Sequence, residues 1–222
     1  MRIKALKIKK DQSPPRLADD LSQSILGLSV QESSPSTQTQ PTRKPARKSN
    51  LAPLMGEGDR IDWNSPRSVV DLTRKIRGEI GLDPCSNPRS IVGARVSWSI
   101  ETGHNGLSQS WAGYGLVYCN PPYGDAIVPW INKAAQEAGR ATQSASLGSF
   151  ATEIVSLLPA RTDTAWFSTL FRSARALAFW RGRLTFLGAP DPAPFPSMLP
   201  YYGPNPYRFA DLFSEYAEIV IL

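Results

Sequence analysis

The sequence has few of the residues from which metal sites and disulfide frameworks are built. It contains two cysteines, Cys85 and Cys119, and one histidine, His104, among 222 residues. The cysteines lie far apart in strand-like stretches and no CxxC pair occurs, which disfavours a disulfide scaffold and favours an intracellular setting. Because His104 has no partners for a metal site or a catalytic triad, we expect no metal and a solvent-facing loop position for this residue.

Long hydrophobic runs are missing as well. No stretch of about 18 apolar residues occurs, and a helix that spans a membrane needs one. The N-terminal sequence MRIKALKIKK is basic but lacks the apolar segment of a signal peptide. The sequence therefore predicts a cytoplasmic protein that has no contact with a membrane.

Charge and composition divide the chain near residue 58. Residues 1–57 hold ten Lys and Arg against five Asp and Glu, whereas the remainder holds fifteen against fourteen. The stretch 11–58 is rich in Ser, Gln, Pro and Thr and has no aromatic residue to anchor a core. We predict a disordered basic tail over 1–58 and one folded domain over 59–222. Such a tail suits a polyanionic partner such as nucleic acid, and a tail that only confers solubility is the alternative.

Helix-like and strand-like segments alternate in the predicted domain. Ser65 is placed to cap a helix whose first residue is Pro66 and whose apolar face runs to Ile80. Further helices are predicted from Asp125 to about Gly139, around 166–171 and near 207–216. Strands are predicted at 82–83, 115–119 and 153–158 and in the segments ALAFW, RLTFL, SMLPYY and EIVIL. This order predicts an α/β fold with a mostly parallel sheet and helices on both of its faces.

The motif NPPYG, which starts at Asn120, follows the predicted strand 115–119 directly. Open parallel sheets bind ligands beyond the carboxyl ends of their strands, so the motif lies where an active site is expected. The consecutive prolines favour extended geometry for Asn120 and Pro121. We therefore expect the Asn120 side-chain oxygen and the Pro121 carbonyl to point outward, where both can bind one target.

The chemistry that suits these two oxygens is the activation of an exocyclic aromatic amine. Such an amine is a poor nucleophile because its lone pair is delocalised into the ring. If both of its hydrogens are accepted, the nitrogen can pyramidalise and direct its lone pair at an electrophilic methyl group. Tyr123 offers a face on which an extruded base can stack, a contact worth about 1–3 kcal/mol. The motif also suits a glutamine amide or a guanine amino group, and a proline-rich turn without chemistry is the remaining alternative.

Together with NPPYG, further segments make the chain from about Trp63 to Leu222 resemble the phage-type DNA N6-adenine methyltransferases of the Dam family. These segments are WNSP, LDPCSNP, NGL before a Trp, LLPART before WF, GRLTF and APFPS. The resemblance implies a Rossmann-like methyltransferase fold that uses S-adenosylmethionine as methyl donor. It also implies double-stranded DNA as partner and N6 of a flipped adenine as acceptor, with Asn120, Pro121, Pro122 and Tyr123 as the catalytic residues.

The resemblance also assigns cofactor-binding residues. LDPCSNP is similar to the first cofactor motif of the family, in which Asp83 would contact the methionine portion and Pro84 would shape the turn. WNSP is similar to the family's W-x-T-P segment, with Trp63 and Pro66 conforming and Ser65 in place of threonine. No glycine-rich turn follows the first strand, which departs from methyltransferases in general.

Three assignments lie outside these motifs. Asn105 stands where the family more often has aspartate, and its amide would bind the adenine edge of the cofactor. Arg161 is expected at DNA phosphate or at the edge of the active site, with a surface salt bridge as the alternative. Phe195 is expected beside the base pocket or in the core. Target specificity is expected in the loops around 88–111 and 189–208.

Two other functions stay open at this point. One is an amino methyltransferase with another acceptor, such as cytosine N4, RNA or a protein glutamine. The other is a DNA-binding phage accessory protein that keeps the methyltransferase shape but has lost catalysis.

Overall fold

A computed structural model describes residues 64–145 and 152–222 of the chain. The predicted tail at 1–58 and Trp63 lie outside the described residues. No helix in the part that is described is long and apolar enough to cross a membrane.

One half of the central sheet is parallel. Its strands are β1 (Leu82–Asp83), β2 (Val96–Ser97), β3 (Leu116–Cys119) and β4 (Glu153–Ser156). They lie in the order β2, β1, β3, β4, and Val117 of β3 is aligned with Leu82 on one side and Ile154 on the other. Because these strands run the same way, their carboxyl ends meet at one edge of the sheet.

The other half of the sheet is antiparallel, which corrects the prediction of a mostly parallel sheet. It consists of β5 (Leu158–Pro159), β6 (Ala176–Trp180), β7 (Ser197–Tyr202) and β8 (Ala217–Ile221). The order continues from β4 through β7 and β6 to β8, β5 also pairs with β7, and all of these pairs are antiparallel. Between β6 and β7 the chain returns through residues 181–196 without a helix, so it pairs with the strand it has just left. The fold is therefore mixed α/β.

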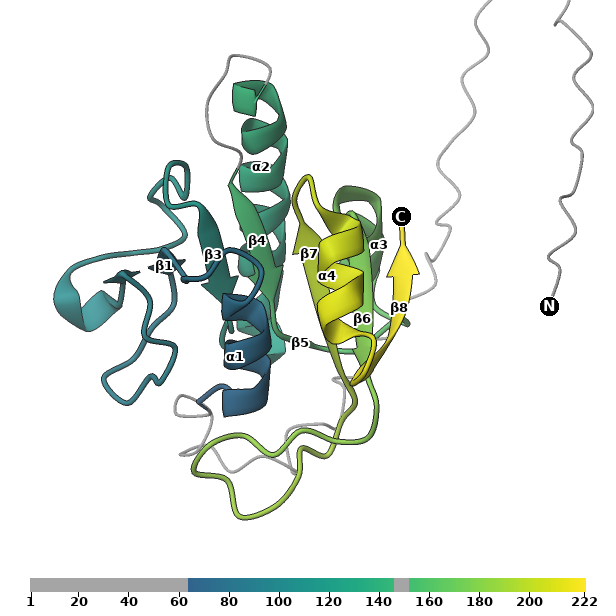
Figure 1. The fold of residues 1–222 in the computed structure, drawn as a ribbon. Coiled ribbons are helices and arrows are strands. Elements are labelled where there is room, and N and C mark those ends of the chain that lie inside the picture. Colours follow the sequence, from purple (N-terminus) through teal and green to yellow (C-terminus); the bar gives the residue numbers. More distant parts are fainter. Residues whose placement is uncertain (1–63, 146–151) are drawn as a thin grey trace, which may run out of the picture. The chain divides into compact units, whose positions relative to one another are not determined.

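The two faces of the sheet are covered by different helices. Residues along β3 alternate between two hydrophobic clusters, since Leu116 and Tyr118 belong to one cluster and Val117 and Cys119 to the other. The first cluster includes buried residues of α1 (Arg67–Arg74) and α4 (Pro206–Phe213), and Figure 1 shows α4 in front of β6 and β7. The second includes residues of α2 (Ile127–Ala145) and α3 (Ala165–Ser173). Helices on both faces are thus confirmed.

The bounds of α1 and α2 differ from the predicted ones at both ends of each helix. Pro66 is the N-cap of α1, so the helix begins one residue after the predicted start, and it ends at Arg74 although Ile76 and Ile80 are buried as expected. A short 3-10 turn, η3 (Gly124–Ala126), precedes α2. α2 continues past Gly139 to Ala145, because one glycine inside a long helix costs only about 1 kcal/mol.

The segment RLTFL is a loop instead of the predicted strand. Leu184 and Phe186 are buried while Thr185 and Leu187 are exposed, so the burial has the two-residue period of a strand. The only strand-like pairing of this segment in the described structure is a single bridge between Leu187 and Asn64. The sequence pattern therefore predicted correctly that alternate residues are buried. It predicted incorrectly that the segment pairs with a neighbouring strand.

Candidate active site

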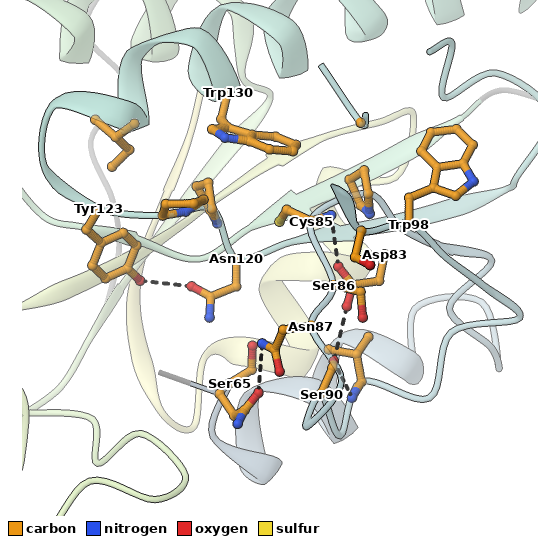
Figure 2. A pocket seen from close by; sticks show the side chains of 18 of the residues that line it. Ser65, Asp83, Cys85, Ser86, Asn87, Ser90, Trp98, Asn120, Tyr123 and Trp130 are labelled. Carbon is orange, nitrogen blue, oxygen red and sulfur yellow. Dashed lines mark hydrogen bonds between the residues drawn. The ribbon is translucent and has the colours of Figure 1, made fainter. Parts of the chain in front are cut away.

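A cavity of about 770 Å³ opens at the edge where the parallel strands end. This volume is within the range of sites for small molecules and cofactors. Ten of the residues predicted to form the site line it: Ser65, Asp83, Pro84, Asn105, Asn120, Pro121, Pro122, Tyr123, Arg161 and Phe195. Figure 2 shows Asn120 and Tyr123 on one side of this cavity and Asp83, Cys85 and Ser86 on the other.

The turn after β1 holds a buried carboxylate. Asp83 is 3% exposed; its Oδ1 accepts from the backbone N–H of Cys85 at 3.3 Å and its Oδ2 from the Ser90 hydroxyl at 3.2 Å. Burial raises the pKa of Asp83 to about 6, and the hydrogen bonds from Cys85, Ser86 and Ser90 oppose this rise. The hydrogen bonds therefore do not fully offset the cost of burying the charged carboxylate. A cation in the cavity would stabilise this charge.

The turn after β3 carries the NPPYG motif. Asn120 is half-buried, Pro121 is buried and Pro122 is exposed. The Tyr123 hydroxyl donates to Asn120 Oδ1 at 3.1 Å and also lies 3.2 Å from the carbonyl oxygen of Leu157, which follows β4. The predicted amine acceptor therefore lies in the cavity and is hydrogen bonded to the predicted stacking residue (Figure 2).

An aromatic wall stands beside this turn. The ring of Tyr123 packs edge-to-face against Phe195 at 5.5 Å and against Phe186 at 6.1 Å between ring centroids. Both phenylalanines come from the loop that joins β6 and β7, and both line the cavity. Phe195 is thus at the cavity and in the core at once, since it is also 8% exposed and part of the first hydrophobic cluster.

The sequence of the chain matches the model of a known protein family. A family model described as DNA N-6-adenine-methyltransferase (Dam) matches residues 55–194, which is more than half of the sequence. The chain belongs to the Dam family. The family is one of DNA adenine N6-methyltransferases, and the match contains the β1 turn, the NPPYG motif and Phe186. No curated protein and no solved structure matches the chain.

Within this Dam-family site, the other residues assigned to the cofactor are placed differently from one another. Ser65 is buried and lines the cavity, whereas Pro66 caps α1 and is not among the lining residues. Asn105 lines the cavity, but its Oδ1 accepts from the backbone N–H of Leu107 at 3.0 Å and so stabilises its own turn. The role of Trp63 stays a prediction because this residue is outside the described part of the chain.

Arg161 lies at the rim of the Dam-family cavity. It follows β5, and its Nε is 3.7 Å from a carboxylate oxygen of Asp163, whose side chain is 76% exposed. A solvent-exposed pair of this kind contributes little to stability and can exchange its partner for a phosphate. Both alternatives offered for Arg161 are therefore compatible with its position.

Aromatic residues that were not predicted from the sequence also line the Dam-family cavity. Trp98 directly follows β2, lines the cavity, and stacks on His104 with 6.2 Å between ring centroids. Trp130 of α2 and Glu101 of the 3-10 turn η2 (Ile100–Thr102) line it too. His104 is exposed as predicted, but it borders the cavity. The missed signal was β2, whose two residues are too few to produce a readable alternation.

A glycine lets the Asn105 loop approach the β1 turn in this Dam-family site. A Cβ on Gly106 would lie 2.0 Å from the Pro84 carbonyl oxygen, so no other residue permits this contact. The Gly106 carbonyl in turn accepts from the Trp111 indole N–H at 2.8 Å.

Within residues 64–145 and 152–222, no three His, Cys, Asp or Glu side chains gather as metal ligands.

Proposed function

We propose that the chain transfers a methyl group from S-adenosylmethionine to N6 of an adenine flipped out of double-stranded DNA. The observation that carries the proposal is that Asn120, Tyr123 and Asp83 line the same cavity. The proposal includes a Rossmann-like methyltransferase fold, which is supported by the parallel strands β1 to β4 and by a cavity at their carboxyl ends.

The charge of the β1 turn supports the binding of this cofactor. S-adenosylmethionine carries positive charges on its sulfonium and amino groups, and when bound it supplies the electrophilic methyl group. The buried Asp83 carboxylate, whose pKa is raised to about 6, gains a counter-charge from such a ligand. Ser65 and Trp98 also line the cavity, with a hydroxyl and an aromatic face.

The NPPYG turn acts on the target base. The Asn120 side-chain oxygen and the Pro121 carbonyl accept the two hydrogens of the adenine amine, which directs the nitrogen lone pair away from the ring plane. The aromatic wall of Tyr123, Phe186 and Phe195 borders the place where the ring of the base would lie. The methyl group moves in one in-line displacement with no covalent enzyme intermediate.

The direct test is the composition of DNA from cells that express the chain. Nucleoside mass spectrometry is expected to detect N6-methyladenine, which is absent from a host without the gene and without its own adenine methyltransferase. Unmodified adenine, or N4-methylcytosine in its place, would contradict the proposal. Calorimetry with S-adenosylmethionine separates the remaining alternative, because a catalytically inactive DNA-binding protein would give no heat of cofactor binding.

A further inference from the structure

The side-chain amide of Asn120 has two ends of opposite hydrogen-bonding character. Its oxygen accepts hydrogen bonds and its nitrogen donates them, and the two ends exchange places by rotation about a single bond. An amine that donates two hydrogens is bound by the oxygen end and repelled by the nitrogen end. An enzyme of the proposed function therefore needs a group that holds the oxygen toward the base.

The Tyr123 hydroxyl is placed to supply this hold. It donates to Asn120 Oδ1 at 3.1 Å, and a carbonyl oxygen can accept two hydrogen bonds. The hydroxyl shares its one hydrogen with the carbonyl oxygen of Leu157, to which it donates at 3.2 Å, so it is held between the Asn120 side chain and the backbone after β4. The ring is held by its edge-to-face packing on Phe186 and Phe195.

The same geometry turns Oδ1 toward the base side of the cavity. The oxygen faces Tyr123, and Tyr123 belongs to the aromatic wall against which the base is proposed to lie (Figure 2). Burial raises the pKa of the Tyr123 hydroxyl well above its ordinary value, so this group stays a neutral donor.

We infer that Tyr123 is a positioning residue: its hydroxyl holds the Asn120 side chain with the oxygen toward the amine, in addition to any stacking by its ring. This inference rests on the proposed function and assigns the hydroxyl a role distinct from that of the ring. It predicts that the hydroxyl matters only while residue 120 has two unlike ends.

The test compares Y123F in two backgrounds, with single-turnover methyl transfer as the readout. Y123F keeps the ring and is expected to lower the rate about fivefold, the value of one hydrogen bond, with the Kd values for S-adenosylmethionine and DNA unchanged within about twofold. In N120D, where either carboxylate oxygen accepts, the same change is expected to alter the rate less than about twofold. Y207F removes a hydroxyl from an exposed tyrosine on α4 and serves as the matched control.

Each result decides the inference. A full rate in Y123F, or an equal loss of rate in both backgrounds, would show that the hydroxyl has no orienting role and would overturn the inference. No methyl transfer by N120D would also overturn it, because two acceptor oxygens at residue 120 would then not be enough for the reaction. If the unaltered chain methylates no adenine, the proposed function fails instead. If the unaltered chain methylates adenine and Y123F does so at the same rate, the proposed function stands and only the positioning role is refuted.

Discussion

The Sγ atoms of Cys85 and Cys119 lie 3.6 Å apart, which joins the turn after β1 to the end of β3. Cys119 immediately precedes Asn120, and Cys85 follows Asp83 by two residues. The proposed cofactor side and the proposed base side of the cavity are therefore in direct contact through two thiols. Burial raises the pKa of the Cys85 thiol well above its ordinary value, so the thiol stays protonated at neutral pH.

The buried Asp83 carboxylate should make stability depend on pH. Its pKa is raised from 3.8 to about 6 in the folded protein, so the folded state holds a proton that the unfolded state has lost between these values. The contribution of Asp83 to stability is thus complete below about pH 4 and is lost as the pH rises through about 6. At neutral pH, D83N should be more stable relative to wild type than at pH 4, by roughly 2 kcal/mol.

Urea unfolding of wild type and D83N at several pH values from 4 to 7 measures this difference. Two stability curves that stay parallel over this interval would refute the assignment of a raised pKa to Asp83.

Because a cationic ligand favours the ionised carboxylate, the affinity of wild type for S-adenosylmethionine should fall as the pH drops below about 6. D83N should lack this dependence in calorimetric titrations.

Gly106 should tolerate no side chain. Its Cβ would meet the Pro84 carbonyl oxygen at 2.0 Å, so G106A forces the Asn105 loop away from the β1 turn. We expect G106A to lower the free energy of unfolding by roughly 2 kcal/mol and to weaken cofactor binding. In the matched control G139A, the new Cβ has nothing within 4 Å and lies inside α2, so stability should rise by up to about 1 kcal/mol. Thermal melts of both variants check the pair, and an unaltered melting temperature in G106A would contradict the close approach.

The buried ion pair of α2 should contribute strongly to the stability of the fold. Glu137 binds Lys133 at 2.6 Å and accepts from the backbone N–H of Trp111 at 3.0 Å, and the side chains of the pair are 1% and 6% exposed. E137A leaves a buried ammonium without its counter-charge and is expected to lower stability by about 3–5 kcal/mol.

An exposed ion pair provides the comparison for E137A. D71A breaks the pair between Asp71 and Arg74, whose side chains are 48% and 34% exposed, and should change stability by less than about 0.5 kcal/mol. Chemical denaturation of the two variants measures both effects. Similar small losses in both would show that burial does not distinguish the two pairs.

Periodicity and turn chemistry predicted the elements that carry the site. The buried strand ending at Cys119, the proline motif after it and the Leu82–Asp83 strand were all readable because they are local. Pairing was not readable, since nothing within RLTFL distinguishes a strand from a loop with alternate residues buried. The hydrogen bond between Tyr123 and Asn120 was also hidden, because it depends on rotamers and on the distant Leu157 and Phe195.

Methyl transfer by N120A tests the central claim most directly. Removing the side-chain acceptor should lower the single-turnover rate of adenine methylation at least about a hundredfold. The affinity for S-adenosylmethionine should stay within about threefold of wild type, because the proposed cofactor contacts lie on the Asp83 side of the cavity. That combination is the predicted result. Adenine methylation by N120A at the wild-type rate would contradict the account.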